Sequence, residues 1–528
     1  MEKLVTTPTK PTGEEIDINA MHDFYTWKRD PKNAGILIKL DMLKTLRLLM
    51  RLGFYRYDVA GGGHIFVRIT DNRINTVTAK TINDSFDDYI KALPVRELDL
   101  TKPANQMDES GEAQVKERIT PDRILEMLSN SDRAKLNGLF DRLRPDSPIK
   151  LMEDDKLNKY LYFRNTIVHI DAKGIKMMPY TNNLPGYIWE SSIVDRDFNY
   201  TDRVGDFEQF CRNICNPTDK QRFRCLMSVI GYLMHNNFEC TRKAVLFTDV
   251  NKDNVGKASG GTGKGLIGKA LGYTLNRNPK EDCKYVSIAG KRFDPTTGNG
   301  TCYSLADATT QLIHIEDLSE RFDFEHLFND ITDGATMRKN YDRQPTVKDV
   351  KFMLSVNHTI NISGSSKSRR ICLFELTNFY DHKHIPEDDF KRRFFESDWE
   401  QADWDQFYSF MCRCAMEYMK SGLLEPERVN YDNRRLEEYF ENNKDFMYWF
   451  KDKIADVLKT QDKNPMRVVL NKAPIFEEYK HDHPNVTIEQ KWFTKWCKAF
   501  LDIKGIPYCE KRSTQDQLII NPCREDRG

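Results

Sequence analysis

The feature that most constrains the fold of this chain is a strand, a glycine-rich loop and a helix in direct succession at residues 243–275. The segment KAVLFTDV has the continuous apolar pattern of a buried strand, and KGLIGKALGYTL carries its apolar residues on one helical face. Between them stands a loop that ends in GGTG. Further strands and helices alternate after it, which is typical of a parallel sheet. We therefore expect an α/β fold built around this loop.

The loop has the composition that a nucleotide polyphosphate requires. Glycines lack the Cβ atoms that would block an arc of backbone N–H groups. Lys264 follows as a mobile positive charge at the start of the helix, where the helix dipole is also positive. The pattern predicts a nucleoside triphosphate site, ATP in the first place, at Gly260, Gly261, Thr262, Gly263, Lys264 and Gly265. The alternative is a glycine-rich turn that touches no ligand.

Two positions depart from the phosphate-loop pattern G-x-x-x-x-G-K-[ST]. Ala258 replaces the first glycine, and Gly265 stands where a Ser or Thr hydroxyl normally binds Mg²⁺. Water, Thr262 or the acidic strand described next can supply the missing ligand, and the residues do not choose among them.

Polar side chains end two further apolar runs. In TTQLIHIEDLSE, Glu316 and Asp317 follow LIHI, and in FMLSVNH the apolar run ends at Asn357. These ends belong to the edge of the sheet where open α/β proteins bind ligands. We assign Asp317 mainly to Mg²⁺, Glu316 mainly to the attacking water, and Asn357 to the water or the γ-phosphate. Taken singly, each is equally compatible with a solvated strand end or a turn.

A pair of arginines precedes the next strand, in SSKSRRICLFEL. Arg369 or Arg370 can reach a neighbouring subunit and neutralise charge on a transferred phosphoryl group. The alternative is a surface salt-bridge donor.

Basic residues outside the site indicate nucleic-acid contact. The segments ATMRKNYD and TVKDVKFML alternate like the arms of a hairpin, and the hairpin carries Arg338, Lys339, Arg343 and Lys348. Near the end of the chain, two helical patterns precede a strand, a polar loop and a strand, which is the order of a winged helix. Its second helix presents Lys491, Lys495 and Lys498 on one face. A solvated lysine face over an aromatic core is the alternative there.

The compact order of GGTGKG, LIHIED, the basic hairpin, FMLSVN and SRR resembles the superfamily 3 helicases of viruses, phages and plasmids, especially the poxvirus primase-helicase-like branch. The resemblance covers roughly residues 120 to 380. It implies a hexameric AAA+ ring that pulls single-stranded DNA through a pore lined by hairpins. By position it makes Lys264 the phosphate-loop lysine, Glu316 and Asp317 the acidic pair, and Asn357 the sensor asparagine. Arg370, with Arg369 in reserve, becomes the arginine finger.

The chain is too long for one core, and composition shifts suggest its divisions. An apolar pattern at residues 36–52 predicts a helix. The expected parts are a small α+β module at 1–100, a linker at 101–118, a helicase partner domain at 119–236, the ATPase core at 237–385, a helical extension at 386–428 and a winged-helix-like domain at 429–528. Residues 1–120 show no convincing D-x-D or D-x-E pair for primer synthesis, so we expect no primer synthesis by this chain and leave a separate primase or polymerase as a possible partner.

Composition limits the other classes of function. Eighty Lys and Arg balance eighty Asp and Glu, so DNA contact must come from local patches. The mean hydropathy is −0.65, and no apolar run approaches the roughly 20 residues of a membrane span. The first residues lack the apolar core of a secretory signal, and the Cys residues lack zinc spacing. We expect a cytoplasmic protein that binds ATP, Mg²⁺, forked or single-stranded DNA and copies of itself.

These observations predict an ATP-dependent DNA helicase for replication of a phage or mobile element. Two alternatives stay open. One is a sequence-specific replication initiator whose ATPase controls assembly at an origin, and the other is a switch ATPase that does not translocate.

Overall fold

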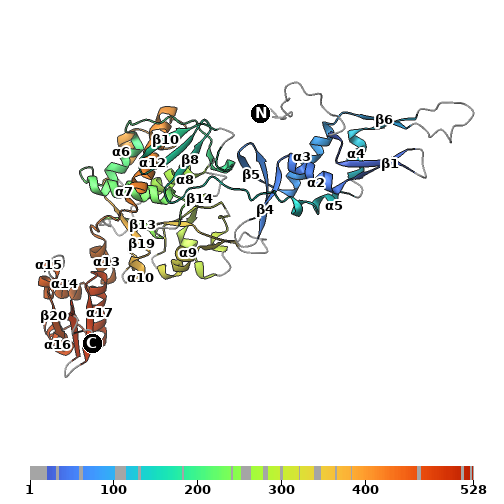
Figure 1. The fold of residues 1–528 in the computed structure, drawn as a ribbon. Helices are drawn as coiled ribbons and strands as arrows, with labels where there is room; N and C mark the ends of the chain where they lie inside the picture. Colours follow the sequence, from blue (N-terminus) through green and yellow to red (C-terminus); the bar gives the residue numbers. More distant parts are fainter. Residues whose placement is uncertain are drawn as a thin grey trace, which may run out of the picture. The chain divides into compact units, whose positions relative to one another are not determined.

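A computed structural model gives the fold of the chain in two compact units (Figure 1). Unit 1 comprises Met1–Met152 with Thr181–Glu190, and unit 2 comprises Glu153–Tyr180 with Ser191–Gly528. The residues that the structure describes are 21–30, 35–58, 63–100, 115–128, 132–180, 184–238, 242–250, 263–276, 284–297, 301–307, 309–319, 322–337, 346–362, 365–381, 383–460, 465–512, 516–523 and 526.

Unit 1 combines small sheets with short helices. Its strands are β1 (Tyr25–Arg29), β2 (Ile36–Leu40), β3 (Phe54–Asp58), β4 (His64–Thr70), β5 (Arg73–Val77), β6 (Arg96–Leu100), β7 (Val115–Ile119) and β11 (Ile188–Trp189). Its helices are α2 (Met42–Arg51), α3 (Ala79–Lys91), α4 (Pro121–Met127), α5 (Arg133–Asn137) and the 3-10 turn η3 (Phe140–Arg142). The pairs β1–β2 and β6–β7 are antiparallel, and the third sheet has the order β11-β5-β4-β3.

The predicted helix at residues 36–52 was wrong over its first five residues. Ile36–Leu40 forms strand β2, which pairs antiparallel with β1 and buries its two end residues. The helix α2 begins only at Met42, because the Asp41 side chain accepts the N–H of Lys44 at 3.1 Å and caps it. The apolar spacing of β2 fits both a helix and a strand, and pairing with β1 makes it a strand.

The boundaries of unit 1 differ from those expected from composition. Strand β7 includes residues 115–118, which were assigned to a linker, and it pairs with β6. Ile119, Ile124 and Leu136, which were assigned to the partner domain, are fully buried in the core of unit 1. Burial of these apolar side chains attaches the segment to unit 1.

The centre of unit 2 is a five-stranded parallel sheet with the order β14-β15-β18-β13-β19. Its strands are β13 (Ala244–Asp249), β14 (Tyr285–Ala289), β15 (Leu312–Glu316), β18 (Lys351–Ser355) and β19 (Ile371–Leu376). β13 runs parallel to β18 on one side and to β19 on the other, and all three are buried throughout. The expected α/β fold with a parallel sheet is confirmed, because strands buried on both faces must be continuously apolar.

Short elements connect these strands. They are α8 (Lys264–Leu275), η5 (Gly290–Arg292), η6 (Pro295–Thr297), η7 (Thr301–Tyr303), η8 (Phe324–Leu327), α9 (Phe328–Asp333), β16 (Ala335–Met337), β17 (Thr346–Lys348), α10 (Ser365–Ser368) and α11 (Pro386–Phe390). The strands β16 and β17 form the predicted antiparallel hairpin. Its second arm is shorter than expected, because residues from Lys351 onward belong to β18.

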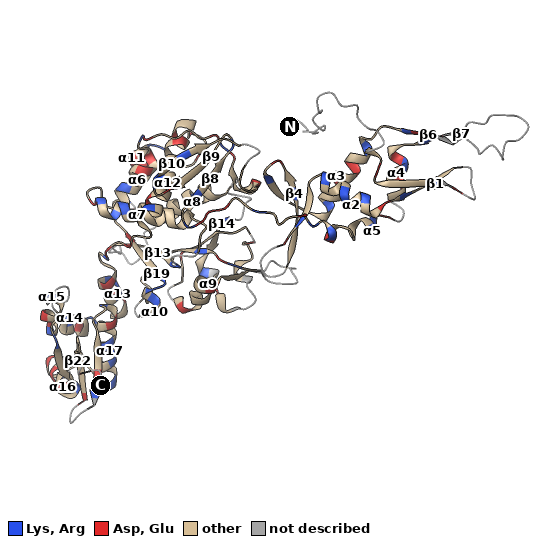
Figure 2. Cartoon of the chain, in the orientation of Figure 1, with Lys and Arg blue, Asp and Glu red and all other residues tan. Residues whose placement is uncertain are grey.

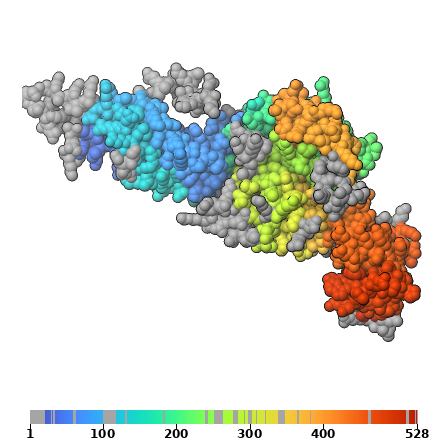
Figure 3. Space-filling view, turned by 180° about the vertical axis from the view of Figure 1, so that it is seen from behind, coloured from blue at the N-terminus to red at the C-terminus, as the bar shows by residue number. Residues whose placement is uncertain are grey.

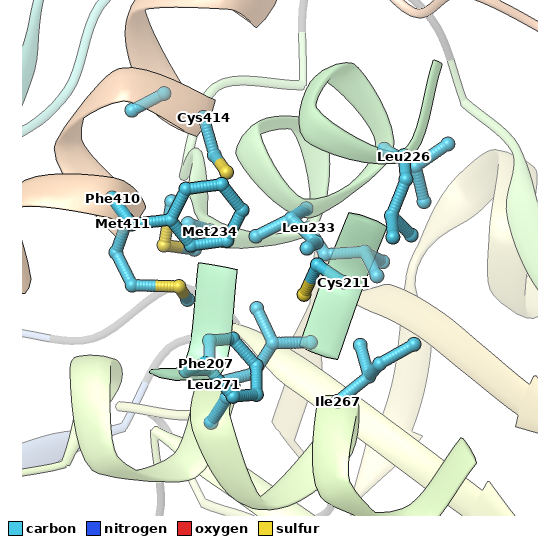
Figure 4. Close-up of a cluster of buried hydrophobic side chains, with 14 of the residues drawn as sticks. Phe207, Cys211, Leu226, Leu233, Met234, Ile267, Leu271, Phe410, Met411 and Cys414 are labelled. Atoms are coloured by element: carbon cyan, nitrogen blue, oxygen red, sulfur yellow. The ribbon is translucent and has the colours of Figure 1, made fainter. Parts of the chain in front are cut away.

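A second sheet and three helices complete the body of unit 2. They are β8 (Lys159–Phe163), β9 (Ile167–Asp171), β10 (Gly174–Met178), β12 (Ile193–Val194), α6 (Asp206–Ile214), α7 (Lys220–Met234) and α12 (Gln401–Ser421). A Cβ added at Gly231 of α7 would lie 2.2 Å from the carbonyl oxygen of Cys414 of α12, so the two helices are in close contact. Side chains of α6, α7, α8 and α12 meet in one apolar core (Figure 4).

The last hundred residues have their own core, the red part of Figure 3. The elements are α13 (Tyr431–Tyr439), α14 (Lys444–Lys453), α15 (Ala455–Thr460), β20 (Val468–Asn471), α16 (Lys472–Asp482), α17 (Gln490–Ile503), β21 (Tyr508–Arg512) and β22 (Asp516–Ile520). The sheet has the order β20-β22-β21. The predicted succession of two helices and two strands is confirmed by α16, α17, β21 and β22.

Positively and negatively charged residues are scattered over the ribbons of both units (Figure 2). None of the helices in the described part of the chain is both long and apolar enough to cross a membrane.

Candidate nucleotide-binding site

A cleft of about 570 Å³ lies at the carboxyl edge of the parallel sheet. Parallel strands end at the same edge, and therefore residues far apart in sequence meet there. The described residues that line the cleft are Gly263, Lys264, Gly265, Leu266, Lys269, Glu316, Asp317, Ser355, Asn357, Ile385, Pro386 and Glu387. The predicted lysine, both acids and the asparagine are thus brought together. Gly260, Gly261 and Thr262 lie outside the described residues.

The start of helix α8 forms one wall of the cleft. Gly263 is the N-cap and has φ +104°, a left-handed conformation that favours glycine. A Cβ at this position would also lie 2.3 Å from the Phe210 ring. Gly265 differs, since an added Cβ there would meet no described atom within 4 Å. The N-terminus of α8 therefore presents its backbone N–H groups and positive dipole end to the cleft.

Lys264 is held by an ion pair that the sequence analysis missed. Its Nζ lies 2.5 Å from Oδ2 of Asp249, the last residue of β13, and the two side chains are only 11% and 8% exposed. Burial lowers the pKa of the Lys264 amine, and the neighbouring Asp249 carboxylate partly offsets that change. The acid at the end of AVLFTD was visible in the sequence, but nothing in the phosphate-loop pattern calls for it.

The two acids of β15 stand in different environments. Asp317 has φ +55°, so the chain turns sharply directly after the strand. Its Oδ1 accepts a hydrogen bond from Asn357 Nδ2 at 2.9 Å, and its Oδ2 lies 3.1 Å from Lys291 Nζ. Glu316 is half-exposed toward the cleft, with 48% of its side chain accessible. The predicted neighbours Asp317 and Asn357 are therefore in direct contact.

The donor set at this edge suits a hard cation. Among the described residues, no group of three or more His, Cys, Asp or Glu side chains could hold a metal ion. Mg²⁺ is usually held by only one or two carboxylates together with water and phosphate oxygens. The oxygens of Asp317 and Glu316 at the cleft meet that requirement.

A buried histidine lies beneath the acids. His314 of β15 is fully buried, and its Nδ1 lies 2.8 Å from the Tyr285 hydroxyl and 3.3 Å from Glu316 Oε1. Its Nε2 lies 3.1 Å from Ser355 Oγ. Burial lowers the pKa of His314 to about 3, so the ring is neutral at ordinary pH. In the sequence, this residue shows only as one position of an apolar strand.

Helix α13 contributes a second unexpected residue. Arg434 is 3% exposed, and its guanidinium donates to the carbonyl oxygens of Asp249 and Asn357, the latter at 3.2 Å. These carbonyls end or follow the two strands that carry the site. The repulsion between this cation and Lys264 contributes to the lowered pKa of the Lys264 amine.

The two predicted arginine-finger residues lie at the opposite edge of the sheet. The carbonyl oxygen of Arg370 accepts the N–H of Ala244, the first residue of β13, at 2.8 Å. The guanidinium of Arg370 stacks 4.6 Å from the Phe328 ring centroid, and its Nε donates to Thr332 Oγ1 at 3.3 Å. Arg369 is exposed beside it. Neither arginine lines the cleft of its own chain.

The hairpin that was predicted to bind DNA is only partly described. Arg338, Lys339 and Arg343 lie outside the described residues. Lys348 lies at the end of β17 and is half-buried, and burial lowers the pKa of its amine. This lysine is therefore less accessible to a phosphate backbone than an exposed one.

The three lysines of α17 are not equivalent. Lys491 and Lys495 are exposed, and the Lys495 amine lies 4.7 Å from the ring centroid of the exposed Trp492. Lys498 is half-buried and pairs with Glu510 of β21 at 2.7 Å. An exposed aromatic ring beside exposed lysines is a surface on which a base can stack.

The comparisons with known proteins give a weak structural likeness. No protein-family model and no curated protein matches the chain. An apo structure of the NrS-1 C-terminal region (residues 305–718) has a TM-score of 0.40 and 10% identity, and covers 91% of this chain and 99% of that one. An A-form apo structure of the same region has a TM-score of 0.38, 10% identity and the same coverage. Another A-form apo structure of that region has a TM-score of 0.31 and 11% identity, and covers 69% of this chain and 97% of that one. These values are too low to assign a family.

Proposed function

We propose that unit 2 is an AAA+ motor core that hydrolyses ATP and drives translocation along single-stranded DNA in a ring of identical subunits. The observation that carries the proposal is the meeting of Lys264, Glu316, Asp317 and Asn357 in one cleft at the carboxyl edge of a parallel sheet. This edge and these residue types are what in-line phosphoryl transfer from a nucleotide requires.

Lys264 is the residue proposed to bind the β- and γ-phosphates. Its amine is paired with Asp249, so a triphosphate competes with that carboxylate for the same positive charge. The backbone N–H groups at the start of α8 add neutral donors. Asp317 would be the main carboxylate that holds Mg²⁺, which supplies charge neutralisation on the phosphate oxygens when bound.

Glu316 is the residue proposed to take the proton of the attacking water. It is half-exposed to the cleft, whereas Asp317 is occupied by contacts with Asn357 and Lys291. A carboxylate that faces the cleft can accept a proton from water as the bond to the γ-phosphate forms. Asn357 orients Asp317 through its amide and leaves its own oxygen for water.

Arg370 is proposed to serve a neighbouring copy of the chain. Strand β19 separates it from the carboxyl edge, and six residues of strand span roughly 20 Å. This distance is too large for the side chain to reach its own cleft. An arginine at the opposite edge suits a ring in which each copy completes the site of the next.

DNA contact is proposed at the β16–β17 hairpin and at the C-terminal body. The succession of a helix, a strand, two helices and a hairpin in residues 455–520 supports a winged-helix assignment for that body. Its exposed contacts are Lys491, Lys495 and the Trp492 ring.

ATP hydrolysis coupled to unwinding is the experiment that tests the proposal. The wild-type chain is expected to displace a strand from forked DNA only with ATP and Mg²⁺. Lys264→Ala is expected to abolish hydrolysis, while Lys459→Ala, which breaks an exposed pair with Asp456, leaves it unchanged. Hydrolysis without strand displacement would favour a switch ATPase, and binding to one duplex sequence without unwinding would favour an initiator.

The arginine hypothesis has a separate test. Arg370→Ala is expected to retain ATP binding but to lose hydrolysis in the assembled ring. Mixing this variant with Lys264→Ala is expected to restore part of the activity, because one mixed interface then contains both intact groups. Wild-type turnover by Arg370→Ala alone would remove the residue from the proposal.

The lysines of α17 offer a matched pair for the DNA contact. Lys491→Ala is expected to lower the affinity for single-stranded DNA and to reduce the slope of log affinity against log salt by roughly 0.7. Lys498→Ala is expected to change both less, since its amine is already paired with Glu510. Equal effects of the two substitutions would contradict this surface.

A further inference from the structure

His314 is a buried polar residue that the proposed reaction does not yet use. It lies two residues before Glu316 on β15, and its ring spans the space between that acid and the neighbouring strand β18. One ring nitrogen contacts Glu316 and Tyr285, and the other contacts Ser355. Ser355 also lines the cleft. The ring therefore connects the acid with a hydroxyl that faces the same space.

The ring is fixed in its position by helix α8. A Cβ added at Gly268 would lie 2.6 Å from His314 Nδ1 and 2.7 Å from the Tyr285 hydroxyl. The helix therefore packs directly on these polar atoms, and the imidazole has no room to turn away from Glu316. A buried ring held this closely keeps its partners at fixed distances.

The two hydroxyl partners fit either tautomer of His314, and the nearby Glu316 carboxylate favours one of them. A neutral imidazole carries a single N–H, and the other nitrogen is an acceptor. A bare lone pair on Nδ1 would face the Glu316 carboxylate at 3.3 Å and repel it. With the proton on Nδ1, the ring donates toward Glu316 Oε1 and the Tyr285 oxygen, and the Ser355 hydroxyl donates to Nε2. This arrangement keeps the two hydrogen bonds of the ring, to Tyr285 and Ser355, and turns the N–H of Nδ1 rather than a lone pair toward Glu316 Oε1 at 3.3 Å.

We propose that His314 is the positioning residue for Glu316. Its Nδ1–H would attract Oε1 of the acid and leave Oε2 for water, and the Ser355 hydroxyl, from a residue that lines the cleft, would donate to Nε2. The inference rests on the proposed role of Glu316 in ATP hydrolysis. His314 does not touch the reacting atoms, so its removal changes the rate of the chemical step without removing a phosphate contact.

Two amide substitutions separate the functions of the two ring nitrogens. In His314→Asn the amide nitrogen stands near the place of Nδ1 and can still donate to Glu316, while in His314→Gln the amide stands near the place of Nε2. We expect kcat for ATP to fall about 10- to 100-fold in His314→Gln, the size of one hydrogen bond to a charged group, with KM within about threefold of wild type. We expect His314→Asn to stay within about tenfold of the wild-type kcat.

His235→Gln is the matched control. His235 is also a buried histidine of unit 2, but it ends α7 and is not among the residues that line the cleft. This control is expected to lower the melting temperature without changing kcat. If His314→Gln has the wild-type kcat, or if the Asn and Gln variants lose kcat equally, the positioning role is refuted.

Ser355→Ala tests the same inference if the His314 variants do not fold. Ser355→Ala removes the hydroxyl at Nε2 and leaves the ring in place. It is expected to lower kcat about 3- to 10-fold, because the proton is then no longer kept on Nδ1, and an unchanged kcat overturns the inference. A wild-type chain without ATPase activity would instead refute the proposed function, so the two failures are distinguishable.

Discussion

Replacement of Asp249 by Asn would show how the Lys264 amine is held before a nucleotide binds. The two side chains form a short ion pair, with Nζ and Oδ2 2.5 Å apart, and both are almost fully buried. Asn retains an oxygen at this position but removes the negative charge. The substitution therefore leaves a hydrogen bond to Lys264 and deletes the electrostatic part of the interaction.

The expected magnitude follows from this difference. Breaking a buried ion pair outright costs about 3–5 kcal/mol. Because one acceptor remains in Asp249→Asn, we expect a loss of about 1–3 kcal/mol in the free energy of unfolding. The affinity for ATP should rise, since the triphosphate no longer competes with a carboxylate for Lys264. Each 1.4 kcal/mol removed from that competition is about tenfold in affinity.

Thermal unfolding with and without Mg-ATP measures both effects. The variant is expected to melt a few degrees lower alone, at roughly 2–4 °C per kcal/mol for a domain of ordinary size, and to gain more from ATP than wild type. Asp456→Asn is the matched control, because this acid pairs with Lys459 at 3.4 Å while it is 79% exposed. An unchanged melting temperature together with weaker ATP binding in Asp249→Asn would refute the reasoning.

Three further substitutions test other parts of the site. Gly265→Ser restores the hydroxyl that phosphate loops use for Mg²⁺, and its Cβ would meet no described atom within 4 Å, so the Mg²⁺ concentration for half-maximal ATPase activity is expected to fall severalfold without loss of stability. Arg434→Met removes the donors to two backbone carbonyls and is expected to cost about 3 kcal/mol in urea unfolding, whereas a cost below about 1 kcal/mol would contradict its structural role. His314 has a pKa of about 3 in the folded chain against 6.5 for the ordinary side chain, so the unfolded state gains protons first, and stability is lost as the pH falls from about 6.5 toward 3. At pH 5 this loss is roughly 2 kcal/mol, and urea unfolding of His314→Gln between pH 7 and pH 5 should lack it.

The central sheet was predictable because its strands are buried on both faces. Runs such as AVLFTD and ICLFEL admit few other structures when a turn and a helix follow. The first 150 residues were harder, because their strands are short and half-exposed. The segment Ile36–Leu40 satisfies helical and strand spacing equally, and only its pairing with β1 decides the outcome.

The site residues were predictable where a reactive side chain stands next to a helix or strand that the sequence pattern indicates. Lys264 begins a helix, Asp317 and Asn357 closely follow strands, and the structure brings all three to one cleft. The supporting residues were not predictable. His314 looks like one more position of a buried strand, and Arg434 lies 185 residues from the carbonyl oxygen that it contacts in Asp249. Contacts over such separations depend on tertiary packing that local patterns do not encode.

The contacts of α13 give the site a direct connection to the C-terminal body. Arg434 binds the carbonyl oxygens that follow the β13 and β18 strands, and the Tyr431 hydroxyl donates to the carbonyl of Ile360 at 2.7 Å and accepts its N–H at 2.9 Å. Asp249 links Lys264 to Arg434, since its side chain pairs with Lys264 and its backbone carbonyl accepts a hydrogen bond from Arg434. A nucleotide bound as proposed would draw Lys264 away from Asp249 and would therefore change the charge balance around Arg434. Because these bonds anchor α13, we expect a change at Lys264 to reach α17, whose end contacts α13 through the hydrogen bond from Lys504 to Asn433.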